Sequence, residues 1–224
     1  RRKGAHSTRP ASTVTAARVA SRAGPVAQHT GMRVARLDSR RMSSAPALPW
    51  RPAQPGDRLQ DVDTPALILD LDKFETNVDR LMRAVKPYGV RVRPHAKSHK
   101  CVQIARRQIA AGAVGICVQK PSEAAVFLAA GIDDVLITNE VVGIAKLRRL
   151  AQLAAAHPQA RLGVLVDELS VVRQLAQCCD EAGARIDVYV ELDVGQNRCG
   201  VTGAVEVVTL ARAIVASPRL NFMG

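Results

Sequence analysis

The feature that most constrains this chain is a regular alternation of short apolar runs with amphipathic segments, from about residue 64 to the end. The apolar runs predict strands, and the segments with apolar residues at helical spacing predict helices. The predicted strands cover residues 66–71, 90–97, 115–119, 134–139, 161–167, 187–193 and 220–223. The predicted helices are one that begins at Leu71 and stops at Gly89, then 99–111, 121–130, 143–156, 169–182 and 203–216.

Strands that alternate with helices in this way form βα units around a parallel sheet. None of the strands is followed by a GxGxxG or GxxxxGK[ST] pattern, so neither dinucleotide-binding nor P-loop phosphate chemistry is indicated. About six similar units in a row favour a (β/α)₈ TIM barrel over an open sheet, and the barrel is incomplete within these residues. In such a barrel the chemistry lies at the carboxyl ends of the strands.

The formal charge of +12 suggests nucleic-acid binding until it is divided along the chain. Residues 1–41 hold 10 Lys and Arg against the single acid Asp38, whereas the rest of the chain has a net charge of only +3. We expect residues 1–45 to be a disordered basic extension and 46–63 to be a Pro-rich lead. Three interpretations of this extension stay open. It is sequence translated upstream of a true start at Met42, a mitochondrial transit peptide, or a basic arm that binds nucleic acid.

The five cysteines are odd in number and lack CxxC spacing, which favours free thiols in a reducing compartment. No run of 18 apolar residues occurs, so no membrane-spanning helix is predicted. We therefore expect a cytoplasmic protein, or a mitochondrial one if residues 1–41 are a transit peptide.

Polar residues stand at the predicted strand ends, as the mouth of a barrel requires. They are Lys97, Gln119, Asn139, Glu140, Asp167, Glu168 and the segment 193–198. By strand alternation Arg93 and His95 lie beneath Lys97 on one face, although Pro94 weakens the strand prediction.

Lys97 is the candidate catalytic residue because it lies in a segment crowded with ionisable side chains, residues 93–100. Neighbouring positive charges disfavour the protonated amine, and a neutral lysine amine attacks carbonyl carbon to form a Schiff base. Lys100, predicted in the first turn of the next helix, is its one competitor. Arg198 lies in a Gly-flanked loop above the mouth and would meet an anion there, while His95 would contact the cofactor or form interior hydrogen bonds.

Four stretches of the chain, residues 63–70, 93–100, 139–143 and 193–201, resemble the family of D-threonine aldolases, 3-hydroxy-D-aspartate aldolases and D-serine dehydratase-like enzymes. These are pyridoxal-phosphate enzymes of the alanine racemase fold type, and the resemblance runs from about Gln54 to Gly224. It implies that Lys97 forms the Schiff base with pyridoxal 5'-phosphate, that Arg198 lies near the cofactor ring and that Gln119 lines the same pocket.

The resemblance also implies the reaction, cleavage of a D-3-hydroxy amino acid such as D-threonine to glycine and acetaldehyde. A dehydratase acting on D-serine or 3-hydroxyaspartate and a non-catalytic pyridoxal-phosphate-binding protein remain alternatives. Residues 64–224 would form part of the cofactor-binding barrel, without the remaining strands, the phosphate cradle or the C-terminal β-domain. The family's divalent metal, manganese or similar, would take its ligands beyond Gly224, so no metal ligand is assigned here. We expect a homodimer when the protein is full length, inactivity of residues 1–224 alone, and neither nucleic-acid nor membrane partners.

Overall fold

The computed structural model describes residues 53–224, which fall into two units, and the expected basic extension lies outside the described residues. Within the first unit, residues 53–69, the only regular element is a short 3-10 helix, η2 (Leu59–Asp61). The strand predicted at 66–71 is not formed, and Leu67, Ile68 and Leu69 are exposed. That prediction was wrong because an apolar run becomes a strand only where another strand accepts its hydrogen bonds.

The second unit, residues 70–224, is built on a parallel sheet of five strands. The strands are β1 (Ile116–Val118), β2 (Asp134–Glu140), β3 (Arg161–Val166), β4 (Ile186–Val190) and β5 (Leu220–Phe222). They lie side by side in chain order, each parallel to the next. This is the order of consecutive barrel strands, and it confirms the predicted α/β fold of an incomplete barrel.

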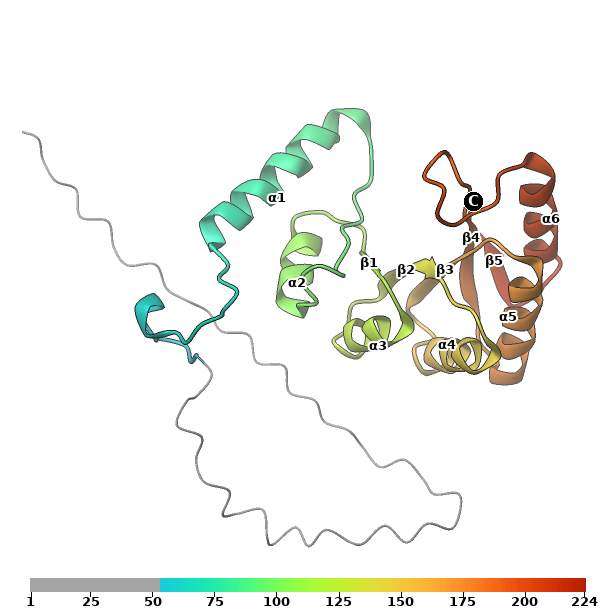
Figure 1. Cartoon of the computed structure of the whole chain (residues 1–224), viewed down its shortest axis with the longest axis horizontal. Helices are drawn as coiled ribbons and strands as arrows, with labels where there is room; N and C mark the ends of the chain where they lie inside the picture. Colours follow the sequence, from blue (N-terminus) through green and yellow to red (C-terminus); the bar gives the residue numbers. More distant parts are fainter. Residues whose placement is uncertain (1–52) are drawn as a thin grey trace, which may run out of the picture. The chain divides into compact units, whose positions relative to one another are not determined.

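The helices of this unit are α1 (Leu71–Val85), α2 (Val102–Ala110), α3 (Pro121–Ala129), α4 (Ile144–Ala156), α5 (Leu169–Ala182) and α6 (Ala204–Val215), and the short η3 (Lys86–Tyr88) follows α1. Figure 1 shows α3, α4, α5 and α6 following one another along the outside of the sheet. The N-cap of α1 is Asp70, whose carboxylate accepts the Lys73 N–H at 3.1 Å. Gly183 ends α5 in a left-handed conformation, as its position after the apolar pattern predicts.

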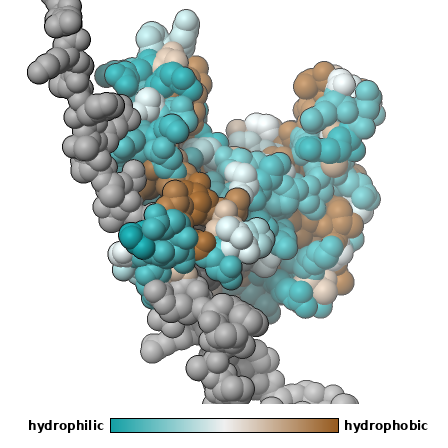
Figure 2. All heavy atoms as spheres, turned by 60° about the vertical axis from the view of Figure 1, so that its left-hand side comes forward, coloured by the Kyte–Doolittle hydropathy of each residue, from teal (hydrophilic) through white to brown (hydrophobic). Residues whose placement is uncertain are grey.

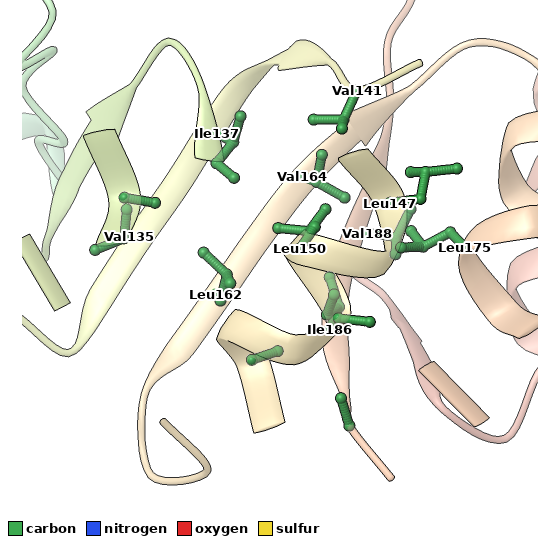
Figure 3. Packing of buried hydrophobic residues seen from close by; sticks show 14 of the residues in the cluster. Val135, Ile137, Val141, Leu147, Leu150, Leu162, Val164, Leu175, Ile186 and Val188 are labelled. Carbon is green, nitrogen blue, oxygen red and sulfur yellow. The ribbon is translucent and has the colours of Figure 1, made fainter. Parts of the chain in front are cut away.

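The core lies between the sheet and these helices (Figure 3). Alternate residues of the strands, such as Val135 and Ile137 of β2, are buried and face Leu147 and Leu150 of α4. The residues between them point to the opposite, inner face of the sheet, which is the lumen of the barrel. Elsewhere apolar side chains reach the surface between hydrophilic ones (Figure 2). Val205, Val208 and Val215 of α6 are exposed.

The strand predicted at 90–97 forms only in part. This segment runs beside β1 and is joined to it by one isolated parallel bridge, His95 to Cys117. Pro94 has no N–H to donate, which breaks the regular ladder that the apolar pattern had predicted. The following helix begins at Val102 rather than at 99, because Lys100 adopts a left-handed φ of 48°.

Candidate active site

Lys97 lies at the carboxyl end of the segment beside β1, where its side chain is exposed. Three backbone hydrogen bonds hold this segment: Val114 N–H to Val92 O at 3.0 Å, Cys117 N–H to Pro94 O and Ala96 N–H to Cys117 O, both at 2.8 Å. His95 pairs with Cys117 in a single bridge, after which residues 96–99 form a turn and leave the strand direction. Lys97 and Gln119 both follow this bridge, and no hydrogen bond or ion pair joins them among the described residues.

His95 lies beneath Lys97 and is hydrogen-bonded through both ring nitrogens. Its Nδ1 accepts the backbone N–H of Lys97 at 3.2 Å, and its Nε2 lies 2.9 Å from Thr138 Oγ1. The Thr138 hydroxyl donates to Val118 O at 3.3 Å, so the imidazole must carry its proton on Nε2 and donate it to Thr138. Burial and the positive charge of Lys97 lower the pKa of His95, which favours this neutral form.

Lys100, the competitor of Lys97, is not in a helical turn but forms an ion pair with Glu123 at 3.1 Å. Glu123 also accepts the backbone N–H of Gln119 at 2.8 Å. Burial opposes ionisation of Glu123, but the N–H of Gln119 and the charge of Lys100 outweigh it and lower the pKa of this carboxyl. Lys100 thus has a fixed partner, whereas the amine of Lys97 has no ion-pair partner within residues 53–224.

Arg198 is carried by a loop whose backbone is tied at several points. One oxygen of Asp193 accepts the N–H groups of Gly195, Gln196 and Asn197 at 2.8–3.1 Å, and these bonds lower the pKa of Asp193. The N–H of Gly200 donates to Asp167 at 3.1 Å, and a Cβ at this glycine would lie 2.6 Å from Asp193 N. The loop therefore presents Arg198, whose side chain is 59% exposed, from a defined backbone.

Glu191 follows β4 and lies between Arg198 and Glu140, the last residue of β2. Its carboxylate is 3.9 Å from Arg198 Nη2 and lies close enough to Glu140 to interact with it electrostatically. Burial and the neighbouring Glu140 raise the pKa of Glu191 to about 7. Glu140 was predicted at a strand end, but its proximity to Glu191 was not, because only the sheet brings these distant residues together.

We expect Glu191→Gln to stabilise the protein at pH 8 and to have little effect at pH 5. A carboxyl whose pKa is raised by folding costs stability as the pH rises from its ordinary value to about 7, and the full cost persists above that. Removing the charge relieves that cost, on the order of 2 kcal/mol. Urea unfolding at the two pH values measures it, with the exposed Glu168→Gln as the control. An equal gain at both pH values would contradict the raised pKa of Glu191.

The opposite end of the inner face carries a row of alternating charges. Arg93 pairs with Asp134, Arg161 lies 3.6 Å from Asp134 and 3.2 Å from Asp187, and Asn221 donates to Asp187 at 3.1 Å. This row links the Lys97 segment to β2, β3, β4 and β5 below the candidate site. It was not foreseen from the sequence.

A hollow of about 630 Å³ opens at the carboxyl ends of β1 and β2, between α3 and α4. Gln119, Asn139, Lys146 and Arg149 line it, whereas Lys97, His95 and Arg198 do not. Arg198 also forms no ion pair with a residue of the Lys97 segment within residues 53–224, so the structure does not join Lys97, Gln119 and Arg198 through direct contacts.

Among the described residues, no three His, Cys, Asp or Glu side chains are arranged to hold a metal ion. Residues 53–224 therefore do not by themselves fit a divalent metal, and we derive no step through one. In the same part of the chain no helix has the length and apolar character needed to cross a membrane.

Comparison with known proteins identifies the alanine racemase N-terminal domain over residues 69–224. The chain is 52% identical over 173 residues to D-threonine aldolase of Arthrobacter sp, covering 77% of this chain and 45% of that protein. It is 42% identical over 174 residues to 3-hydroxy-D-aspartate aldolase of Paracoccus denitrificans, covering 77% and 44%.

The fold is also similar to solved structures. D-threonine aldolase from Filomicrobium marinum superposes with a TM-score of 0.71 at 54% identity, covering 74% of this chain and 44% of that one. D-threo-3-hydroxyaspartate dehydratase from Delftia sp. HT23 superposes with a TM-score of 0.65 at 31% identity, covering 72% and 42%. The chain thus spans less than half the length of these relatives.

Proposed function

Because the chain belongs to the alanine racemase N-terminal domain family, we propose that it forms part of a pyridoxal-phosphate-dependent lyase that cleaves D-3-hydroxy amino acids. The observation that carries this proposal is the 52% identity to a D-threonine aldolase, with a family match that includes Lys97, Gln119 and Arg198. The proposed reaction is the cleavage of D-threonine to glycine and acetaldehyde.

The side chains at the strand ends fit this cofactor. The exposed amine of Lys97 is available to hold it covalently, and Gln119 follows β1 at the same end of the sheet. Arg198 offers a cation on a defined loop to an anionic oxygen of the cofactor or substrate. When bound, the cofactor supplies an electron sink for cleavage of the Cα–Cβ bond.

The residues of this chain supply binding and orientation for that chemistry. His95 binds the backbone N–H of Lys97 and, because its pKa is lowered, adds no second positive charge beneath the amine. Arg198 lies near Glu191, so a carboxylate at the end of β4 orients its guanidinium group. Lys97 Nζ would also be a group that can carry a proton at the mouth.

The test is to incubate the whole protein, loaded with pyridoxal phosphate and manganese, with D-threonine. We expect acetaldehyde and glycine in equal amounts, and no product from L-threonine. Formation of a 2-oxo acid from D-serine or 3-hydroxyaspartate, without acetaldehyde from D-threonine, would instead identify a dehydratase. Cofactor binding without turnover of any of these substrates would identify a pyridoxal-phosphate-binding protein.

A further inference from the structure

The segment that carries Lys97 is held by little regular sheet structure. Residues 90–97 share one isolated bridge with β1, and Pro94 removes a donor from the ladder. Residues 96–99 form a turn, so no ladder hydrogen bond holds Lys97 itself. Its placement therefore depends on contacts outside the backbone ladder.

Two side-chain contacts from this segment pass over β1 and reach β2. Arg93 pairs with Asp134, and both side chains are largely buried, with 19% and 23% exposed. His95 reaches Thr138 at 2.9 Å. Gly115 of the intervening chain makes room for the first contact, because a Cβ there would lie 2.8 Å from the Cβ of Asp134.

The two contacts differ in how closely they approach Lys97. The ion pair of Arg93 fixes the start of the segment, four residues before the lysine. His95 instead binds the backbone N–H of Lys97 itself through Nδ1, which can accept only while it carries no proton. The Thr138 hydroxyl already donates to Val118 O, so it is left to accept from Nε2.

We propose that Thr138 is a positioning residue for Lys97, acting through the Nε2–H tautomer of His95. The hydroxyl of Thr138 selects this tautomer, and the free Nδ1 then holds the Lys97 backbone in the register that presents its amine at the mouth. The effect of this positioning on catalysis rests on the proposed function, whereas the tautomer of His95 and the position of the Lys97 backbone do not.

The first measurement needs no cofactor. Long-range ¹H–¹⁵N spectra of the histidine-labelled whole protein report which ring nitrogen of His95 is protonated, with the signal assigned by His95→Gln. We expect the Nε2–H tautomer. A predominant Nδ1–H form or an imidazolium at pH 7.5 would overturn the proposal.

The second measurement compares Thr138→Val, which removes the acceptor, with Thr138→Ser, which keeps it. In the cofactor-free protein we expect the rate of acylation of Lys97, followed by peptide mass spectrometry, to change about three- to ten-fold in Thr138→Val and to be restored in Thr138→Ser. Thr209→Val is the matched control, because Thr209 bonds only within α6, to Val205 O at 2.7 Å. Equal acylation rates in Thr138→Val and wild type would overturn the proposal.

These outcomes separate the positioning role from the proposed activity. Suppose that His95 shows the expected tautomer and Thr138→Val changes the acylation rate as expected, but the protein cleaves no D-3-hydroxy amino acid. That outcome would refute the proposed function and leave the positioning role of Thr138 intact. If Thr138→Val does not fold, Thr138→Ser and the wild-type tautomer still decide the question.

Discussion

Lys97→Ala is expected to abolish covalent binding of pyridoxal phosphate and to lower D-threonine cleavage by about 1,000-fold or more. Lys97 is exposed at the end of the segment beside β1, with no ion-pair partner among the described residues. Borohydride reduction of the loaded wild-type protein, followed by peptide mapping, should place the cofactor on Lys97. The same treatment of the variant should give no modified peptide.

The matched control for this prediction is Lys100→Ala, three residues further along the chain. Lys100 forms an ion pair with Glu123. Its left-handed backbone turns the chain toward the start of α2. We expect this variant to retain covalent cofactor. Recovery of the cofactor on Lys100 in wild type would contradict the assignment of Lys97.

Arg198→Ala is expected to weaken cofactor binding about 10- to 150-fold without unfolding the protein. The physical reason is the loss of a charge-assisted hydrogen bond, worth about 1.5–3 kcal/mol, to an anionic oxygen. Few packing contacts are lost, because the side chain is 59% exposed and its ion pair with Glu191 is long, at 3.9 Å. Fluorescence titration with pyridoxal phosphate and a thermal melt measure the two effects.

Two further variants make the Arg198 result specific. Arg198→Lys keeps the charge but not the planar donor array, so we expect an intermediate affinity. Arg212→Ala removes an exposed arginine from the last turn of α6 and should leave affinity unchanged. A lower melting temperature in Arg198→Ala, with unchanged affinity, would show that Arg198 is structural.

Much of the fold could be predicted because its signals are local. The apolar spacing of α5, together with Gly183 after it, gave a helix at 169–182 that the structure reproduces. The strands at 134–139 and 161–167 agree with β2 and β3 to within one residue. The likeness of successive βα units also gave the order of the strands, since consecutive strands of a barrel are neighbours.

The failures lie where pairing decides the structure. The apolar residues at 66–71 looked like a strand, but no ladder forms there. The segment at 90–97 pairs with β1 through a single bridge because Pro94 interrupts its donors. A pattern of side chains along one segment cannot show whether a second segment will accept its hydrogen bonds.

The sequence by itself determined the fold class and the end of the sheet at which polar groups gather. It also identified Lys97, Gln119, Arg198 and His95 as candidate site residues. These features were accessible because periodicity, glycine stops and strand-end positions are properties of adjacent residues. Only the tertiary structure decided what those candidates contact. Three contacts join separate strands. They are the hydrogen bond from His95 to Thr138, the neighbouring carboxyls of Glu140 and Glu191, and the row of polar side chains from Arg93 to Asn221. Such contacts arise when parallel strands align in register, and no local pattern encodes that register.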